Sequence, residues 1–142
     1  MKLNTIGAEL AKIDGVTAIT DVTGFGLLGH LLEICQGSGL SAAVQLDAVP
    51  LLDPAIIDYL NQGCVPGGSG RNWDSISDSI SGTDPLSQTL LCDPQTSGGL
   101  LLAVEPESAQ QVSDLLRDAG CCYESIGELS QADGNPTIQV IA

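Results

Sequence analysis

The sequence predicts an α+β fold in which helices pack on a mixed β-sheet. Short apolar and β-branched segments alternate along the chain with segments whose apolar residues recur at helical spacing. The length of 142 residues suits one domain. Aromatic residues make up 3% of the chain against 43% hydrophobic residues, so the core must be built mainly from aliphatic side chains. The expected element order, α-β-α-β-α-α-β-α-β-β, is typical of a mixed sheet with helices on it.

The first half of the chain alternates helix and strand. Its expected elements are a helix at Thr5–Ile13, a strand at Val16–Thr20, a helix carrying Leu27, Leu28, Leu31, Leu32 and Cys35, a strand at Ala42–Leu46, a turn at Pro50–Pro54 and a helix at Ala55–Asn61. The leucine spacing gives the second helix one apolar face, and Gly37 and Gly39 are its stop signals. No strong N-cap residue precedes the first helix, which favours a chain cut from something longer.

The second half begins with a segment of different character. Gln62–Thr83 is rich in glycine and serine and offers little to pack, so we expect a long surface loop there, with Trp73 as its packing anchor. The elements that follow are a helix at Pro85–Leu91, a polar loop at Asp93–Gly99, a strand at Leu100–Val104, a helix opened by Pro106 and ended by Gly120, and a hairpin-like pair, Cys122–Leu129 and Thr137–Ile141, around Asp133-Gly134-Asn135.

The charge of the chain excludes several classes of partner. Eighteen acidic residues stand against four lysines and arginines, which gives a formal net charge of −14. Such a surface repels phosphate backbones and anionic lipids, so we expect neither a nucleic acid nor a membrane surface as a partner. A divalent cation or a basic partner surface is favoured instead.

The cysteine count indicates reduced thiols in a cytoplasmic protein. The five cysteines are an odd number without a CxxC pair, and His30 is the single histidine, so a structural zinc site is not expected. None of the cysteines lies beside a lysine or histidine in the sequence, so a low-pKa nucleophile is not indicated. No signal peptide opens the chain and no apolar stretch is long enough to span a membrane. These observations predict a cytoplasmic location.

The segment after the first strand is the sharpest candidate site. Gly24, Gly26 and Gly29 form a GxGxxG pattern at the start of a helix, where backbone N–H groups can face an anion. Asp47 follows at about the distance that a dinucleotide fold requires. As a bare pattern this signal is weak, because the preceding strand is short and ends in polar residues.

Asp21 changes what this segment can bind. A carboxylate beside an anion site repels phosphate unless a cation lies between them, so Asp21 is a candidate magnesium ligand, and Thr23 can donate to an oxygen. The competing interpretation is structural: Asp21 and Thr23 cap the helix, and the glycines allow close packing. On the motif alone the structural interpretation is the stronger one.

Two further segments carry polar side chains that could act in a site. The loop Asp93–Gly99 offers Asp93, Gln95, Thr96 and Ser97, although on this segment alone an Asp-Pro turn leading into a strand is the better explanation. Arg71 could clamp a phosphate or carboxylate, or simply pair with an acid of this chain. His30 has no partner visible in the sequence and is interpreted as a packing residue.

Three long motifs, in the right order, resemble the signature of the selenophosphate synthetase (selenide, water dikinase) family. They are Thr20–His30 (TDVTGFGLLGH), Val65–Gly68 (VPGG) with Arg71-Asn72 behind it, and Leu91–Leu101 (LCDPQTSGGLL); Ile126-Gly127-Glu128 matches the last part of the family. The resemblance implies that residues 15–142 are a C-terminal domain and that residues 1–14 are the remnant of an inter-domain helix. By the same resemblance, we expect the ATP-binding N-terminal domain of the family to lie outside this sequence. The implied fold is that of the C-terminal domain shared with aminoimidazole ribonucleotide synthetase.

The resemblance also implies an activity that is split between two domains. Members of the family make selenophosphate from ATP and selenide, with release of AMP and orthophosphate and with magnesium between carboxylates and phosphates. The reactive Cys or selenocysteine, a Lys and most metal-binding Asp residues belong to the missing half. Asp21 would be the one magnesium ligand that this domain supplies, Thr23, Gly24 and Gly26 would line the same edge, and the loop Asp93–Gly99 would lie near it.

From this resemblance we expect no catalytic residue in the chain, an inactive isolated domain, and its own ATP-binding domain as partner. The intact protein is expected to be a homodimer. Two alternatives remain open: a free-standing module that binds an anion or nucleotide at Gly24–Gly29, or an interaction domain without chemistry. A purine-synthesis enzyme of the same fold is a nearer rival, which the three motifs disfavour.

Overall fold

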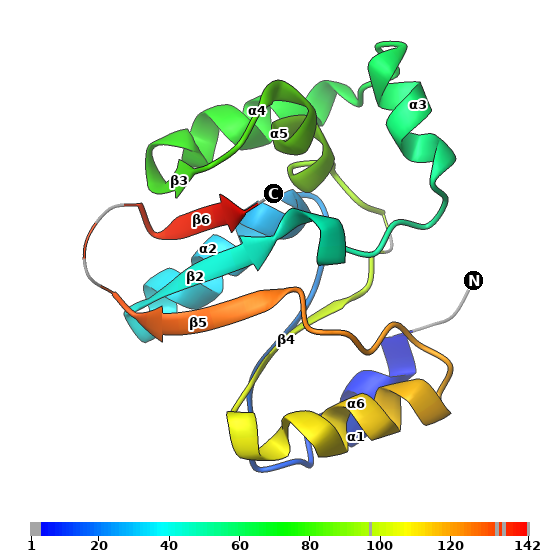
Figure 1. The fold of residues 1–142 in the computed structure, drawn as a ribbon, viewed down its shortest axis with the longest axis vertical. Coiled ribbons are helices and arrows are strands. Elements are labelled where there is room, and N and C mark those ends of the chain that lie inside the picture. Colours follow the sequence, from blue (N-terminus) through cyan, green and yellow to red (C-terminus); the bar gives the residue numbers. More distant parts are fainter. Residues whose placement is uncertain (1–3, 97, 133, 135, 142) are drawn as a thin grey trace.

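The computed structural model describes residues 4–96, 98–132, 134 and 136–141, and it confirms the α+β prediction (Figure 1). The elements are α1 (Gly7–Leu10), β1 (Val16–Asp21), α2 (Gly26–Ser38), β2 (Leu40–Gln45), α3 (Ala55–Asn61), α4 (Gly67–Ile76), β3 (Ile80–Ser81), α5 (Pro85–Leu91), β4 (Leu100–Val104), α6 (Ala109–Asp118), β5 (Gly127–Gln131) and β6 (Ile138–Ile141). Short 3₁₀ turns lie at Asn4–Ile6, Leu46–Ala48, Ser77–Ser79 and Pro106–Ser108.

The strands form two separate sheets. The larger sheet is mixed and has the order β3-β6-β2-β5, with β2 parallel to β6 and antiparallel to β5. β1 and β4 form an antiparallel pair of their own. In Figure 1 this pair runs from the level of the larger sheet to α1 and α6, which lie together at the end of the molecule opposite α4. The upper ends of β1 and β4 therefore carry the two polar loops to the same place.

The core lies between α2 and the larger sheet. Leu28 and Cys35 of α2 are fully buried, as is Ile138 of β6, and Val44 of β2 is 1% exposed. Leu31 and Leu32 are buried beside them, so the leucine spacing correctly predicted the buried face. The helix continues past Gly37 and ends at Gly39, whose φ of 68° is the left-handed conformation usual after a helix.

The predicted loop at residues 62–83 is wrong, because this segment contains α4 and the short strand β3. One face of α4 packs inward: Trp73 and Ile76 lie against the core and Ser69 is 1% exposed. A Cβ on Gly68 would lie 2.9 Å from Pro94 Cγ, so the glycine at this position allows α4 to approach Pro94 closely. Trp73 does anchor the segment, as part of a helix.

The predicted hairpin near the C-terminus is also wrong. β5 and β6 do not pair with each other but lie on opposite edges of β2. β2 is a buried strand whose two edges need partners, and this non-local requirement decides the pairing. Of the expected turn, Asp133 and Asn135 lie outside the described residues, and the strand expected from Cys122 begins only at Gly127. The first predicted helix is shorter too, since α1 ends at Leu10.

All five cysteines are free, and two of them are fully buried. Burial raises the pKa of the Cys35 thiol and raises that of Cys92 to about 11. Cys64 and Cys122 are exposed. None of the helices in the described ranges is long and apolar enough to cross a membrane.

These differences predict a selective reaction with thiol reagents. At pH 8 only about one Cys92 thiol in a thousand is ionised, because its pKa lies about three units higher. We expect a maleimide to label Cys64 and Cys122 of the folded protein within minutes, while Cys35 and Cys92 react only after unfolding. Peptide mass spectrometry of native and denatured samples measures this, and equal labelling of Cys92 and Cys64 in the native sample would contradict it.

Candidate functional site

The site is built where β1 ends and β4 begins. The ladder between the two strands continues past them, because the Val22 N–H donates to Gly99 O at 2.9 Å and the Gly98 N–H donates to Val22 O at 3.1 Å. The Gln95 N–H then donates to Thr23 O at 3.0 Å. Two of the three sequence motifs, around residues 21–30 and 91–101, therefore lie directly against each other. Ser97 of the second motif lies outside the described residues.

The third motif joins them through Asn72. Its Nδ2 atom donates to Gly24 O at 2.8 Å and to Cys92 O at 3.0 Å, so one amide on α4 connects both loops. Asn72 belongs to one of the three sequence motifs, but the sequence did not predict a role for it. Its two contacts join it to residues 48 and 20 positions away, Gly24 and Cys92. Arg71, its neighbour, is exposed and forms no ion pair within the described part of the chain.

The bridging amide predicts a loss of stability on a nearly isosteric change. In Asn72→Asp a carboxylate faces the two carbonyl oxygens and cannot donate to them, so we expect the free energy of unfolding to fall by about 1–3 kcal/mol. Asn61→Asp, at the exposed end of α3, carries the same change of charge and is expected to cost at most about 0.5 kcal/mol. Urea denaturation measures both, and equal midpoints for the two variants would contradict the bridging role.

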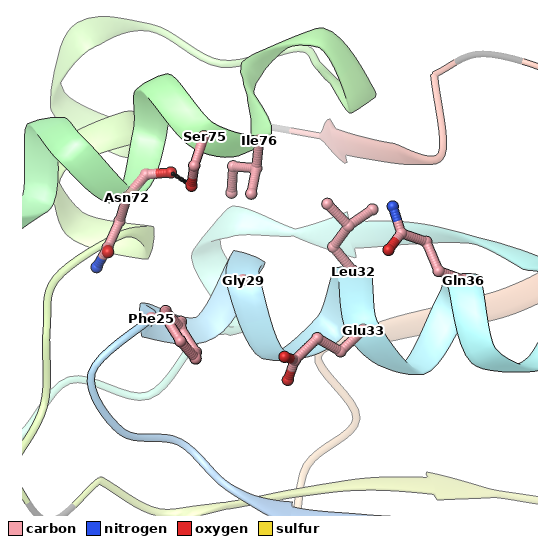
Figure 2. A pocket seen from close by; sticks show the side chains of 8 residues that line it. All are labelled: Phe25, Gly29, Leu32, Glu33, Gln36, Asn72, Ser75 and Ile76. Carbon is pink, nitrogen blue, oxygen red and sulfur yellow. Dashed lines mark hydrogen bonds between the residues drawn. The ribbon is translucent and has the colours of Figure 1, made fainter.

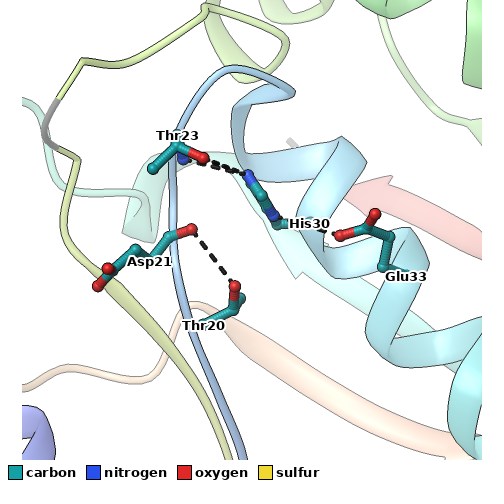
Figure 3. Close-up of polar contacts among 5 residues, drawn as sticks. All are labelled: Thr20, Asp21, Thr23, His30 and Glu33. Carbon is teal, nitrogen blue, oxygen red and sulfur yellow. Dashed lines mark hydrogen bonds and ion pairs between the residues drawn. The ribbon is translucent and has the colours of Figure 1, made fainter.

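Asp21 is the last residue of β1 and is exposed. Its Oδ1 atom accepts a hydrogen bond from Asn4 Nδ2 at 2.8 Å, and the same amide donates to Gly98 O at 3.2 Å. The side chain of Thr20 donates to the backbone oxygen of Asp21 (Figure 3). The N-terminal segment thus fixes one oxygen of the carboxylate, a contact that the sequence did not predict.

As a metal site, Asp21 fits only as one member of a larger set of ligands. Its exposed carboxylate oxygen is a ligand type that magnesium prefers. Across the described ranges, however, no three His, Cys, Asp or Glu side chains lie together as a metal site requires. Within these ranges Asp21 therefore belongs to no ready-made magnesium site.

Thr23 lies two residues after Asp21 and contacts His30 of α2 (Figure 3). The Thr23 N–H donates to His30 Nε2 at 3.1 Å, and Thr23 Oγ1 lies 3.1 Å from the same nitrogen. On the other side of the ring, Nδ1 lies 3.4 Å from an Oε2 atom of Glu33. His30 is 7% exposed, so it is a buried residue as expected. Its Nε2 is paired with Thr23, which the sequence did not reveal, whereas its buried Nδ1 has no hydrogen-bond partner within the described residues.

The three glycines of the GxGxxG pattern do different things. Gly26 has φ of 72°, and a Cβ there would lie 2.7 Å from the Cys92 carbonyl carbon. A Cβ on Gly29 would meet the side chain of Phe25, also at 2.7 Å, whereas one on Gly24 would meet nothing within 4 Å. Gly26 and Gly29 therefore serve close packing, and only Gly24 faces open space.

The dinucleotide interpretation of Asp47 is excluded. A dinucleotide fold needs parallel neighbouring strands on either side of the glycine-rich helix. Here β1 is antiparallel to β4 and lies in a different sheet from β2. Asp47 is an exposed residue of the 3₁₀ turn after β2.

Asp93 opens the second loop and is partly buried. Desolvation raises the pKa of its carboxyl, and a hydrogen bond from Gln95 Nε2 to Oδ2 opposes that rise. Asp93 and Gln95 are thus hydrogen-bonded to each other within the loop, so these two polar side chains have a structural role.

A pocket of about 230 Å³ lies beside the site, between α2 and α4 (Figure 2). Its walls are Phe25, Gly29, Leu32, Glu33, Gln36, Asn72, Ser75 and Ile76. Asn72 points from α4 toward the loop at Phe25 (Figure 2). Four of these eight lining residues are polar and the others are apolar, so the lining does not indicate one ligand.

Comparison with known proteins gives this arrangement its family. Residues 1–139 match the family described as AIR synthase related protein, C-terminal domain. The chain belongs to this family. The match agrees with the expected fold, similar to the C-terminal domain of the aminoimidazole ribonucleotide synthetase-like superfamily.

Curated relatives of this AIR synthase related domain carry the name "Selenide, water dikinase". One from Yersinia pseudotuberculosis serotype I is 56% identical over 132 residues, which cover 93% of this chain and 38% of the relative. One from Haemophilus influenzae strain Rd is 54% identical over 128 residues, which cover 90% of this chain and 37% of the relative. One from Aeromonas hydrophila is 50% identical over 139 residues, which cover 98% of this chain and 40% of the relative. These matches confirm the resemblance drawn from the three motifs, and the chain spans about two fifths of the length of these relatives.

Proposed function

We propose that this domain is the C-terminal part of a selenide, water dikinase, a phosphotransferase that makes selenophosphate from selenide and ATP and releases AMP and orthophosphate. The observation that carries the proposal is the identity of 56% over 93% of the chain to a relative of that name. Residues 15–142 form the C-terminal domain, and residues 1–14 belong to the connection with the ATP-binding domain. The intact enzyme is a homodimer in the cytoplasm.

In this proposal the domain contributes the edge from Asp21 to Gly26 to a shared active site. Asp21 is exposed at the end of β1, where it can join carboxylates of another domain around magnesium. The chemistry that magnesium supplies in phosphoryl transfer is neutralisation of phosphate charge and alignment of the reacting oxygens. Thr23 and Gly24 follow Asp21 within three residues, and the open space around Gly24 leaves room for a phosphate.

The domain also closes the site and keeps water from reactive intermediates. Supporting this role, the loops at residues 21–26 and 92–99 are held together by backbone hydrogen bonds and by Asn72, so they form one preformed wall. A preformed wall costs no reordering when the other domain docks. Neither nucleophile nor base is assigned to this chain, and the isolated domain is expected to produce no selenophosphate.

A chimera tests the proposal. The segment of the Yersinia pseudotuberculosis relative that matches this chain is replaced by the chain itself, and phosphorus NMR follows ATP in the presence of magnesium and selenide. We expect selenophosphate and AMP from the chimera and none from the isolated domain. A folded chimera that forms neither product while the parent relative forms both would overturn the proposal, and nucleotide binding by the isolated domain at micromolar concentration would favour a free-standing module.

A further inference from the structure

The hydrogen bond between Thr23 and His30 determines which nitrogen of the ring carries the proton. A backbone N–H can only donate, so Nε2, which lies 3.1 Å from Thr23 N, must accept. An accepting Nε2 leaves the hydrogen of the neutral ring on Nδ1. Nδ1 lies 3.4 Å from an oxygen of the Glu33 carboxylate (Figure 3) but makes no hydrogen bond within the described residues, so the tautomer follows from the Thr23 contact alone.

The Thr23 N–H has no other partner in the described residues. Both backbone groups of the preceding Val22 are used by Gly98 and Gly99, and Thr23 O accepts from Gln95 and Gly26. Phe25, the N-cap residue of α2, offers no side-chain hydrogen bond. His30, which is 7% exposed, therefore supplies from inside α2 the acceptor for a backbone N–H of the turn that precedes the helix.

The same nitrogen contacts the side chain of Thr23. Oγ1 lies 3.1 Å from Nε2, so one atom of His30 restrains both the backbone and the hydroxyl of Thr23. Thr23 is two residues from Asp21, and the strand pairing of Val22 between them leaves that short segment no freedom of its own. The position of the His30 ring therefore determines the position of Thr23 and, through Val22, that of the exposed Asp21.

We propose that His30 is a positioning residue for the segment from Asp21 to Gly26. Its ring is protonated on Nδ1, and its Nε2 atom holds Thr23 in place. Through Thr23, the ring also fixes the turn that presents Asp21. The functional part of this inference rests on the proposed function, whereas the contact itself does not. His30 touches no substrate in this scheme and acts through Thr23.

The contact is tested first by nitrogen NMR on this chain, where the single histidine makes the assignment unambiguous. We expect a protonated Nδ1, an unprotonated Nε2, and a scalar coupling across the hydrogen bond between Thr23 N and Nε2. A neutral ring protonated on Nε2 would overturn the proposal, whatever the enzyme activity turns out to be.

The positioning role is tested by three variants in the chimera described above. In His30→Gln the amide oxygen lies as many bonds from Cα as Nε2 does and can accept the Thr23 N–H. In His30→Asn the oxygen corresponds to Nδ1 and cannot reach it, and His30→Leu accepts nothing. We expect the Gln variant to keep kcat within about threefold, while the Asn and Leu variants lose about tenfold or more and need more magnesium for half-maximal rate.

The pair Gln and Asn separates positioning from general loss of structure, because both place an uncharged amide in the same helix. Thermal unfolding of each variant shows whether it is folded at the assay temperature. Equal activities of folded Gln and Asn variants, or full activity of the Leu variant, would overturn the positioning role. A chimera that is inactive even with His30 would overturn the proposed function, and the NMR measurement would still decide the contact.

Discussion

Selenophosphate formation by the chimera is expected to fall by about 100-fold or more in Asp21→Asn, since changes even to outer-shell partners of metal ligands cost about 10–100-fold. The variant keeps a side chain of the same shape but removes the charge with which Asp21 is proposed to bind magnesium. The rate should recover in part at higher magnesium concentration, because the remaining ligands are untouched. Phosphorus NMR over a magnesium series measures both effects.

Asp118→Asn is the matched control for this experiment. Asp118 is an exposed residue at the end of α6, and its replacement also removes one of the 18 acids of the chain. We expect its rate and its magnesium dependence to equal those of the unsubstituted chimera. If Asp21→Asn behaved in the same way as Asp118→Asn, Asp21 would not be a magnesium ligand, while the family assignment would stand.

Gly26→Ala is expected to lower the free energy of unfolding by about 2–5 kcal/mol, which combines the strain of a left-handed alanine with overpacking. Gly26 has φ of 72°, and an added Cβ would lie 2.7 Å from the Cys92 carbonyl carbon and 2.9 Å from Leu91 O. These atoms belong to the backbone and cannot swing away. Urea denaturation measures the loss, with the slope m as a check on two-state behaviour.

The control for this variant lies in the same helix. Gly37 is inside α2, has no positive φ, and a Cβ there would meet nothing within 4 Å. Gly37→Ala is therefore expected to stabilise the protein by about 0.5–1 kcal/mol. Destabilisation of the two variants by the same amount would show that the contact between Gly26 and Cys92 is not the cause.

Elements governed by local signals were predicted well from the sequence. α3, α5 and β4 have the bounds that their residues indicated. α5 shows why: Asp84 and Ser87 form a capping box at its start, and this signal is written in neighbouring residues. The buried face of α2 follows in the same way from its leucine spacing.

Elements whose structure depends on distant partners were not predicted. α4 is poor in helix-forming residues, and its helix is stabilised by packing of Trp73 and Ile76 on the core. The pairing of β5 and β6 depends on the two free edges of β2, which a turn signal between them cannot report. The structure of α4 and the pairing of β5 and β6 therefore depend on tertiary contacts, which local sequence signals do not report.

The residues of the candidate site show the same difference between local and distant signals. Asp21 and Thr23 were proposed as site residues because a carboxylate beside an anion site needs a cation and because the motif resembles that of the family, and their role stays a prediction. Asn4 and Asn72 were missed because their amides act on residues that are remote in the sequence. His30 was interpreted as a packing residue, since nothing in the sequence shows that a ring on α2 turns back to the residue that precedes the helix.

The separation of β1 and β4 from the larger sheet has a mechanical consequence. A two-stranded ribbon bends and twists more readily than a wide sheet. Because β1 runs into Asp21 and β4 leaves from the paired Gly98–Gly99 segment, flexing of the ribbon carries both loops as one body and preserves their mutual spacing. Within the described residues Asn72 hydrogen-bonds both loops to α4 and His30 hydrogen-bonds Thr23 to α2, so these two side chains would limit how far the loops move with the ribbon.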